Sequence, residues 1–564
     1  MGSITIKKYF KSPILLVSTV VFFSYMFFWL IRVRQYLPVN AISQVLHTQE
    51  ISFLFFLFVS YEFLVKAKKD NCEELLGSIK HAKLKDIMCA LIWLILEMII
   101  LCIGIFTVLY ETGENTMAYI EYTVKFVGIH YFLLNVLAIV VGAIFSVIFK
   151  PIHAYTGMLV LYMLFSSKII SSIQQLSYGK EILYRFSDLL SVYSRDFSAM
   201  GDSYYLYSVE FVNVERILIF LGIFLSLFLL VRQNGWKKIT AMGPVVFTIV
   251  CIVLFFKPTS AVNLDNGVSG QDALTADDTY YRASNDCMDE TQYSTPKFQV
   301  SSYKAKFQID RQLHAQVTVE LKENRNSQCE FTLYHGYKIK KIQDQNGKAV
   351  HYEQKGDYIT IDENASKYTF FYDGYCKRYY STSQGAFLPG YFSYYPMPGK
   401  RRIYWIADGY WGNALEGLGY CVNFDVTINT NTKVACNLEQ KGDRHFVGKS
   451  DGMTIFASNF LDRVSFGKYT IVLSRLSEEY ATLEENRECY QEFIKKYQNK
   501  GQKVKTIFIP PYLNGTMYYF GKDHVIGTVD TLEYYYNIYK TTGYLYDFIS
   551  NDELSGLIGD ENND

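Results

Sequence analysis

The sequence predicts an α-helical membrane bundle of about seven spans, joined to an extracellular domain that is mostly a β-sandwich and ends in a small α/β extension. Three observations lead to this fold class. Long apolar runs with short polar gaps fill the chain up to Lys257. The remainder has no run near the ~20 apolar residues that a helical bilayer crossing needs, and shows short alternating patterns typical of strands. The net charge of +0 and the mean hydropathy of +0.04 therefore average an apolar part and a polar part.

Residues 1–257 form the predicted membrane domain. Its seven apolar segments cover about 12–34, 51–66, 86–110, 124–149, 154–174, 214–232 and 239–257. The first segment is too long for the apolar core of a signal peptide, and no small-residue cleavage site follows it. We therefore expect it to stay in the protein as a helix.

Basic residues gather in alternate connections between these segments. They are Lys7, Lys8, Lys11, Lys66, Lys68, Lys69, Lys80, Lys83, Lys85, Lys150, Arg232, Lys237 and Lys238. Because Lys and Arg are enriched in cytoplasmic loops, the pattern predicts a cytoplasmic N-terminus in the plasma membrane. Arg32 and Arg34 oppose this orientation but are outnumbered. With seven spans, everything beyond Lys257 is expected outside the cell.

The predicted cytoplasmic loop 66–85 is charged and has the apolar spacing of an amphipathic helix. It resembles the segment between the second and third helices of type-2 ABC exporter permeases. The matching residues are Glu73, Glu74, Leu75, Leu76, Ser78 and Ile79. The resemblance implies a coupling helix that docks on a cytoplasmic ABC ATPase subunit, and pairing with a second permease copy or a related permease. The Gly-Thr and Pro that usually flank this motif are missing, and a solvated loop without a partner is the alternative.

Three ionisable residues lie inside predicted spans and form a candidate intramembrane polar site: Glu97, His130 and Lys168. Such residues are costly in a bilayer and normally face protein or water. Glu97 lies near the middle of its span, so it is the best candidate for lining a pathway. His130 and Lys168 lie nearer to span ends, where their polar tips can reach the interface. Structural pairing is the alternative for all three.

The second part of the chain divides into a polar connector (258–295), a predicted antiparallel β-sandwich (296–474) and a small α/β extension (475–564). Short alternating segments run through the sandwich, with hairpin turns at Asn346-Gly347 and at Lys355-Gly356-Asp357. The extension combines a helical pattern at 476–499 with a strand at 503–511.

Two short segments of this part are similar to the N-terminal β domain of the aminopeptidase N family of zinc peptidases. They are Leu388-Pro389-Gly390 and Tyr394-Tyr395-Pro396, followed by a strand pair at about 420–442. The resemblance implies that residues 475–564 correspond to the opening of the catalytic domain that follows the β domain in that family.

The residues for peptidase chemistry are not in this sequence. The family binds zinc through His-Glu-x-x-His on a helix, whereas no two of the nine histidines lie four apart: 47, 81, 130, 153, 314, 335, 351, 445 and 524. A phosphate-loop-like segment at 442–450 has five residues between its glycines instead of four and lies in a strand pattern, so it is predicted to be a hairpin. We therefore expect no catalytic residues, no metal, no cofactor and no enzyme activity of the chain itself.

Six of the ten cysteines lie beyond Lys257: Cys287, Cys329, Cys376, Cys421, Cys436 and Cys489. An even number in an oxidising compartment permits disulfides. Cys421 and Cys436 flank a predicted hairpin and are the candidate pair. Buried free thiols fit the low cysteine density equally well.

Together these features predict a permease subunit of an ATP-driven ABC-type exporter. A separate subunit would hydrolyse ATP, and the substrate, of peptide-like or lipid-like class, would move outward. The extracellular domain would bind or cap without catalysis. The alternative is a membrane-anchored extracellular receptor that transports nothing. The neutral charge and the absence of a basic recognition pattern argue against a nucleic-acid partner.

Overall fold

The computed structural model describes most of both parts of the chain. The described residues are 12–33, 42, 44–69, 82–111, 117–166, 169, 172–173, 186, 188–193, 203–232, 241–257, 259, 280–281, 296, 298–322, 328–407, 410–413, 415–467, 469–485, 487–488, 490–491, 504–511 and 519–527. The chain divides into two compact units. The first contains Met1–Gly201, Leu206–Lys257 and Asn263–Val268, and the second contains Asp202–Tyr205, Pro258–Val262 and Ser269–Asp564.

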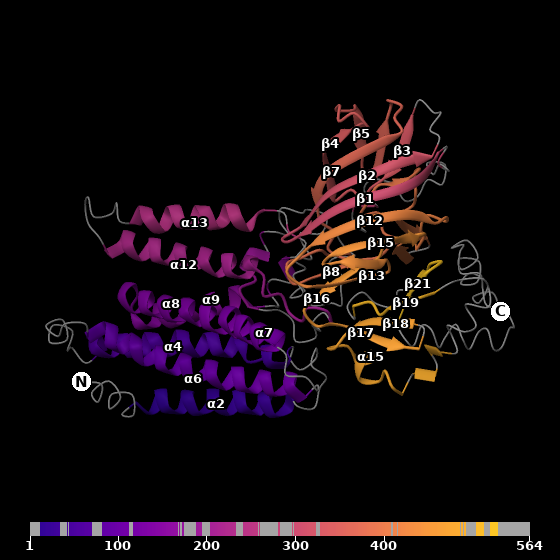
Figure 1. Cartoon of the computed structure of the whole chain (residues 1–564). Coiled ribbons are helices and arrows are strands. Elements are labelled where there is room, and N and C mark those ends of the chain that lie inside the picture. Colours follow the sequence, from indigo (N-terminus) through magenta and orange to yellow (C-terminus); the bar gives the residue numbers. More distant parts are fainter. Residues whose placement is uncertain are drawn as a thin grey trace, which may run out of the picture. The chain divides into compact units, whose positions relative to one another are not determined.

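The first unit is a bundle of helices that run alongside one another (Figure 1). Its elements are α2 (Pro13–Val33), α4 (Gln49–Lys69), α6 (Ala82–Glu111), α7 (Met117–Val127), the π-helical turn η1 (Gly128–Leu133), α8 (Leu134–Ile148), α9 (Pro151–Leu164), α12 (Phe211–Arg232) and α13 (Met242–Phe255). Each of the seven predicted apolar segments coincides with a helix, with α7, η1 and α8 forming one continuous rod.

Five of these helical segments are long and apolar enough to cross a membrane: Pro13–Val33, Gln44–Val65, Ala90–Tyr110, Met117–Ile148 and Phe211–Val231. Helices α9 and α13 have 14 residues each, shorter than the ~20 residues of a full crossing. The predicted membrane-embedded helical unit therefore fits the structure. Of the seven predicted spans, five correspond to described helices that are long enough for a full crossing.

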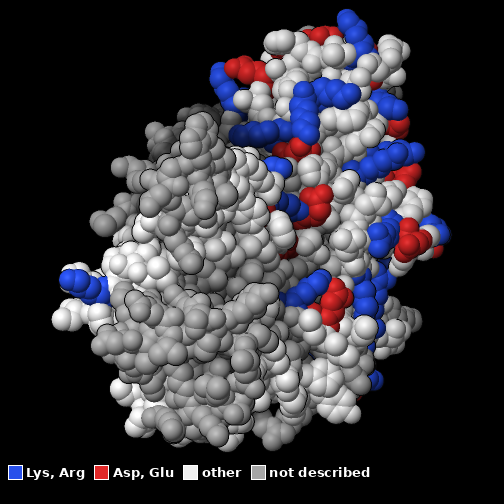
Figure 2. All heavy atoms as spheres, turned by 90° about the vertical axis from the view of Figure 1, so that its left-hand side faces the viewer, with Lys and Arg blue, Asp and Glu red and all other residues white. Residues whose placement is uncertain are grey.

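The outer faces of the bundle are apolar. On α2 and α13, large aliphatic side chains such as Ile14, Val17, Val246 and Val253 are more than half exposed. Figure 2 shows charged side chains gathered over the described part of the β-strand unit, whereas the described helices on that face are mostly uncharged. A helix with an apolar exposed face is more stable in contact with lipid than with water.

Small residues let two pairs of helices approach closely. A Cβ atom added at Gly142 on α8 would lie 2.0 Å from Ser60 Oγ and 2.5 Å from the carbonyl oxygen of Leu57 on α4. On α12, a Cβ atom at Gly222 would lie 2.2 Å from Thr248 Oγ1 of α13. Glycine at such contacts is typical of helix packing in membranes.

The main sheet of the second unit has seven strands in the order β14-β15-β12-β1-β2-β7-β4. Their bounds are β1 (Gln299–Ile309), β2 (Leu313–Lys322), β4 (Tyr337–Gln343), β7 (Lys367–Gly374), β12 (Val422–Asn429), β14 (Glu439–Gly442) and β15 (His445–Ser450). All neighbouring strands are antiparallel except β1 and β12, which pair in parallel from Ser302 opposite Asn423 to Gln308 opposite Asn429. The predicted sandwich was antiparallel throughout, and this central pair departs from it.

Three smaller sheets accompany the main one among the described residues. The first contains β5 (Tyr352–Lys355), β6 (Tyr358–Ile361), β3 (Cys329–Thr332) and β9 (Met397–Pro398). The second contains β13 (Lys433–Cys436), β16 (Ile455–Ser458) and β8 (Gly385–Leu388). The third is the hairpin of β10 (Tyr404–Ala407) and β11 (Tyr410–Asn413).

Buried tyrosines connect these layers through their hydroxyl groups. Tyr303 on β1 donates to the carbonyl of Pro396 at 2.9 Å, and Tyr372 on β7 donates to the carbonyl of Tyr394 at 2.7 Å. The Tyr394 hydroxyl in turn donates to the Met453 carbonyl at 2.6 Å. Each ring fills the apolar core while its hydroxyl satisfies a buried carbonyl.

A fifth sheet crosses the predicted boundary at residue 474. It consists of β17 (Leu461–Phe466), β18 (Tyr469–Ser474), β19 (Thr506–Phe508), β21 (His524–Ile526) and β20 (Tyr519–Phe520), with the short helix α15 (Glu478–Ala481) after β18. The predicted boundary at 474 therefore lies within this sheet, because β18 pairs with β19 of the extension. Their shared core includes Ile471, Leu473, Ile507 and Val525.

Candidate functional site

A carboxyl group is buried halfway along α6, inside the helical unit. Glu97 is 0% exposed, and Ser52 on α4 donates a hydrogen bond of 2.5 Å to its Oε1. Asn135 on α8 donates from Nδ2 to Glu97 Oε2 at 3.0 Å and to Ser52 Oγ at 2.7 Å. Ser52 and Asn135 are also 0% exposed. Three helices thus meet at one closed triangle of polar side chains, which we call the Glu97 cluster.

A second layer of polar contacts lies beside this cluster. Tyr131 donates to the Val45 carbonyl at 2.8 Å, and its hydroxyl lies 3.0 Å from Thr48 Oγ1. Gln49 donates from Nε2 to the His130 carbonyl at 2.8 Å. These bonds tie the start of α4 to the turn η1.

The turn η1 places part of this layer. A π-helical turn bonds each residue to the fifth one along instead of the fourth, which widens the helix, and such turns are frequent at functional sites. His130 and Tyr131 lie within it, and Asn135 lies one turn further along in α8. The widened turn therefore precedes the residue that completes the Glu97 cluster.

His130 was expected near a span end, with its tip at the interface, and this expectation was wrong. Because the helix begins at Met117 rather than at 124, His130 lies inside the rod and is 6% exposed. Its Nε2 lies 2.9 Å from the Ser208 carbonyl, so the ring has a structural partner. Lys168 and the predicted coupling residues lie outside the described part of the chain: Glu73, Glu74, Leu75, Leu76, Ser78 and Ile79.

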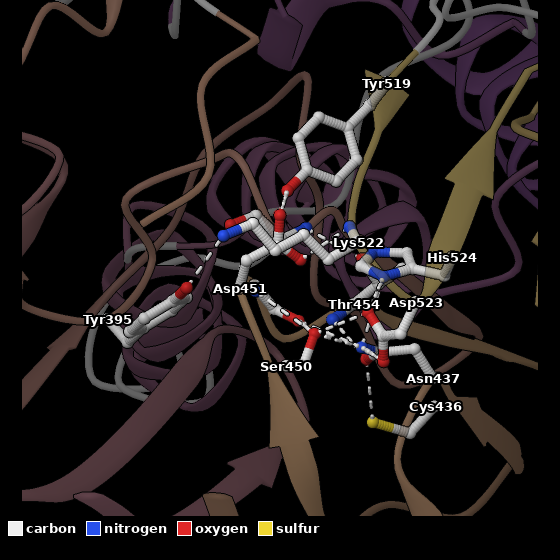
Figure 3. A network of polar contacts seen from close by, with 12 residues as sticks. Tyr395, Cys436, Asn437, Ser450, Asp451, Thr454, Tyr519, Lys522, Asp523 and His524 are labelled. Atoms are coloured by element: carbon white, nitrogen blue, oxygen red, sulfur yellow. Dashed lines mark hydrogen bonds and ion pairs between the residues drawn. The ribbon is translucent and has the colours of Figure 1, made fainter. Parts of the chain in front are cut away.

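The second unit holds a different polar network, drawn in Figure 3. His524 on β21 donates from Nδ1 to Asp523 Oδ1 at 2.8 Å, and its Nε2 lies 2.7 Å from Thr454 Oγ1. Ser450, at the end of β15, donates to Asp523 Oδ1 at 2.7 Å. Asn437 joins them, with Nδ2 3.2 Å from Asp523 Oδ2. The network therefore links residues after β13 and β15 with the β20–β21 hairpin.

Asp451 extends the network toward β20. Its Oδ1 accepts the backbone N–H of Lys522 at 3.0 Å, and its Oδ2 accepts the Tyr519 hydroxyl at 3.3 Å. Burial raises the pKa of Tyr519 well above its ordinary value, and the charge of Asp451 adds to this effect. Tyr519 therefore stays a hydrogen-bond donor.

The electrostatics of Asp523 follow from its partners. Burial works to raise the pKa of Asp523, but the charge and hydrogen bond of His524, with the hydrogen bonds of Ser450 and Asn437, hold it below its ordinary value. The carboxylate is therefore ionised and paired. The contacts with His524, Ser450 and Asn437 thus stabilise the negative charge of Asp523.

Asp451, Asp523 and His524 each bring one ligand atom to within 4.8 Å of the others, a spacing that a metal ion would accept. Their oxygens and nitrogens are already engaged with Ser450, Thr454, Tyr519 and the backbone of Lys522. Among these described residues no buried side-chain N or O atom is left without a hydrogen-bond partner. We therefore interpret the network as a structural hub.

The candidate disulfide between Cys421 and Cys436 is not formed, since both are free thiols in the structure. The pairing was proposed across one hairpin, but β12 and β13 belong to different sheets. Val422 pairs with Ser450, whereas Cys436 pairs with Ile455. Burial raises the pKa of Cys436 to about 12, so this thiol is held in its unreactive form.

Sequence reasoning found Glu97 but missed its partners and the outer hub. An Asn within the apolar run of α8 and a Ser in that of α4 were signals that could have been followed. The hub left a weaker signal, the adjacent ionisable residues Asp523 and His524.

A comparison with solved structures found matches that include an LTA4 hydrolase and an M1 zinc metallopeptidase. Yeast LTA4 hydrolase in complex with bestatin matches with a TM-score of 0.29 at 10% identity, over 42% of this chain and 42% of that chain. The M1 zinc metallopeptidase from Deinococcus radiodurans matches with a TM-score of 0.22 at 12% identity, over 32% of this chain and 47% of that chain. The match thus spans less than half the length of either protein.

A scan against protein-family models and a search of curated proteins found no match. The membership of the helical unit in the exporter permease family therefore stays a prediction. Neither an activity nor a substrate of this chain follows from structural similarity at the level given above.

Proposed function

We propose that this protein is the permease subunit of an ATP-driven, ABC-type exporter. In this proposal the helical unit moves a peptide-like or lipid-like substrate outward, and the second unit is a non-catalytic extracellular domain that binds or caps. A cytoplasmic ATPase subunit and a second permease, identical or related, complete the transporter. The observation that carries the proposal is the Glu97 cluster.

A bundle that served only as an anchor could be built without this cluster. Placing a carboxyl group at the middle of a membrane helix costs on the order of 3 kcal/mol or more. Glu97 sits at such a position, and Ser52 and Asn135 from two other helices hold it there. Polar groups at this depth are characteristic of pathways through a bundle. The cluster therefore favours a function within the helical unit.

Energy for transport must then come from another chain. The segment that looks like a phosphate loop is the β14–β15 hairpin, with Asp443 and Arg444 at its turn. Arg444 has a φ of 60° there, which suits a tight hairpin turn. The resemblance of the loop 66–85 to a coupling helix names the partner, a cytoplasmic ABC ATPase.

The proposal predicts that Glu74→Arg combined with Leu75→Asp removes the ATPase from the purified protein. Charge reversal and a buried apolar loss at a docking helix should lower the amount of bound ATPase at least about 10-fold. The measurement is quantitative mass spectrometry of the tagged full chain purified from its own membranes. A matched control places Gln233→Arg and Asn234→Asp in another predicted cytoplasmic loop.

The control variant should keep the ATPase at the wild-type level. If the ATPase stays bound to the Glu74→Arg, Leu75→Asp variant, the coupling role of this loop is wrong. If no ATPase co-purifies even with the wild-type chain, the proposal of an ATP-driven exporter is contradicted.

The second candidate function is a membrane-anchored extracellular receptor. The size and dense packing of the second unit favour it, since its aromatic core and polar hub form an ordered domain without any need for transport. The two candidates differ at Glu97. Glu97→Gln should abolish export if the bundle is a pathway, and should leave ligand binding by the second unit unchanged if the bundle is an anchor.

A further inference from the structure

We infer that the Glu97 cluster is a binding site for a monovalent cation, either a proton or an alkali ion such as Na⁺. Its role in transport rests on the proposed function, but cation binding itself can be measured without transport. Four observations lead to it: the hydrogen-bond count, the orphan acceptor, the missing counter-charge and the three-helix geometry.

The hydrogen bonds of the cluster leave acceptors in excess. Ser52 has one O–H donor and Asn135 has two N–H donors. Glu97 Oε1 accepts from Ser52, Glu97 Oε2 accepts from Asn135, and Ser52 Oγ accepts the remaining Asn135 contact. All three donors are then used, while carboxylate oxygens retain unused lone pairs.

One further acceptor in the same place has no donor at all. Asn135 Oδ1 is buried without a hydrogen-bond partner among the described residues. It belongs to the amide whose Nδ2 contacts both Glu97 and Ser52, so it lies within the cluster. A buried acceptor without a hydrogen-bond donor destabilises the folded protein. The cluster therefore lacks a donor or a cation.

No positive charge in the described part of the chain offsets Glu97. Its hydrogen bonds there are with Ser52 and Asn135, and none of the described salt bridges includes it. A carboxylate in this low-dielectric setting needs a counter-charge or a proton. One positive charge is thus needed to neutralise the Glu97 carboxylate.

The titratable groups on the neighbouring elements have other partners. On α4, Glu50 accepts from Tyr162 at 3.4 Å and Glu62 accepts from Tyr155. On η1, His130 contacts the Ser208 carbonyl and Tyr131 contacts Thr48.

The remaining neighbours of α6 are α2, α7 and α8. Arg32 on α2 lies over the Trp29 ring, 5.6 Å from its centroid. On α7, Lys125 pairs with Glu121 at 2.6 Å on an exposed face. Helix α8 contains no charged residue. Tyr131 is the titratable group among these that interacts electrostatically with Glu97, and it carries no positive charge. We therefore expect the state of Glu97 to follow the bound cation.

Both cations suit these atoms. Carboxylate, hydroxyl and amide oxygens are the ligands that hard cations prefer, and Glu97, Ser52 and Asn135 supply all three kinds. A proton would sit on a Glu97 oxygen and cancel its charge, and an alkali ion would supply the counter-charge directly. Either way the negative charge of the cluster is neutralised.

The site spans α4, α6 and α8, so its occupancy is linked to how these helices sit together. A cation that draws Glu97, Ser52 and Asn135 inward stabilises one arrangement of the three helices over any other. Within the proposed exporter, cation exchange at this point would therefore be coupled to opening and closing of the bundle.

The test uses the full chain in lipid nanodiscs, with two readouts. For Na⁺, thermal unfolding is measured at constant ionic strength as Na⁺ replaces N-methyl-D-glucamine. Saturating Na⁺ should raise the Tm of the wild type by about 2–4 °C. For a proton, infrared spectroscopy at neutral pH should show the C=O stretch of a protonated carboxyl group.

Glu97→Gln should remove whichever signal the wild type gives. The matched control is Glu121→Gln, the same chemical change at the exposed carboxyl of α7, and it should keep the signal. A Na⁺ effect alone identifies an alkali-ion site, and the infrared band alone identifies a proton site. The absence of both in the wild type would overturn the inference.

A second variant protects the test against loss of folding. Glu97→Gln combined with Asn135→Asp moves the carboxyl group from α6 to α8 within the same triangle. This exchange should restore the wild-type cation signal, and a folded exchange variant without it would contradict the inference. Co-purification of the ATPase is read separately, so a failed cation test leaves the exporter proposal standing.

Discussion

Two carboxyl groups of this protein, the half-buried Asp523 and the buried Glu97, are stabilised in opposite ways. In the second unit, Asp523 pairs with His524 and accepts hydrogen bonds from Ser450 and Asn437, so its negative charge is met by its neighbours. In the helical unit, Glu97 has a hydroxyl and an amide beside it and no described cation. The contacts of Asp523 contribute to stability. The inferred cation at Glu97, by contrast, would bind and leave reversibly.

Asp523→Asn tests the first arrangement. Because the folded-state pKa of Asp523 lies below that of the unfolded chain, about 3.9, its contribution is fully present above that value. It is lost as the pH falls through the lower, folded-state pKa. Replacement by Asn should therefore destabilise the second unit by about 1–3 kcal/mol near neutral pH, and the gap should shrink below about pH 4.

The measurement is thermal unfolding of the full chain in nanodiscs, followed by near-ultraviolet circular dichroism of the tyrosine-rich second unit. Asp443→Asn at the exposed β14–β15 turn is the control and should change little. A gap between wild type and Asp523→Asn that stays constant down to pH 2 would show that the ionised carboxylate contributes nothing.

At the scale of elements, glycine sets how close the helices lie. Gly142 and Gly243 are both helical, but only Gly142 has another helix within 4 Å of its absent Cβ atom. A backbone carbonyl, that of Leu57, lies in the way there and cannot rotate aside. The close approach of α4 and α8, which brings Ser52 and Asn135 to Glu97, therefore requires a residue without a Cβ atom at position 142.

Gly142→Ala and Gly243→Ala should have opposite effects on the stability of the helical unit. At 243 the new methyl group meets nothing, and Ala should gain about 0.5–1 kcal/mol from helix propensity. At 142 it should cost about 1–3 kcal/mol through overpacking. Thermal unfolding of both variants in nanodiscs measures the sign of each change in Tm. Equal changes in Tm for the two variants would refute the close contact between α4 and α8.

The helices were predictable from the sequence and their contacts were not. Long apolar runs specify α2, α6 and α12 without any knowledge of partners, because the bilayer alone dictates their length. Ser52 and Asn135, by contrast, acquire meaning only when α4 and α8 are brought to Glu97. No local pattern encodes which face of one helix meets which face of another.

The strands show the same limit in another form. Residues 461–474 were placed inside the predicted sandwich because of its alternating patterns, but alternation is identical for any sheet that a strand joins. Their parallel partner β19 lies beyond a helix-like stretch, so the pairing could not be read from 461–474 alone. Likewise the Asp523-His524 pair was visible, whereas Ser450 and Asn437 come from distant turns.

At the scale of the whole molecule, two units of different composition carry separate tasks. The helical unit exposes apolar side chains and buries several polar ones, among them Glu97, whereas the second unit has a largely apolar core and a separate polar network around Asp523 and His524. The proposed transport and cation binding belong to the first unit, and recognition of an external ligand belongs to the second.

The interpretation of the second unit as non-catalytic predicts no stoichiometric zinc in the purified protein and no hydrolysis of aminoacyl substrates. The reason is the sequence, which offers no His-Glu-x-x-His pair. Inductively coupled plasma mass spectrometry of the full chain measures the zinc. One zinc per chain would contradict the interpretation, and its loss in His524→Ala would assign the metal to the hub.

The parallel pairing of β1 with β12 has a consequence for biogenesis. Ser302 and Asn423 lie far apart in the chain, so one edge of β1 has no partner until the ribosome has made the later strand. An unpaired edge of this kind invites pairing with another chain, and such distant contacts form slowly. While the second unit is being made, its central strand is therefore vulnerable to aggregation, and a chaperone at the membrane surface would raise the yield of correctly assembled protein.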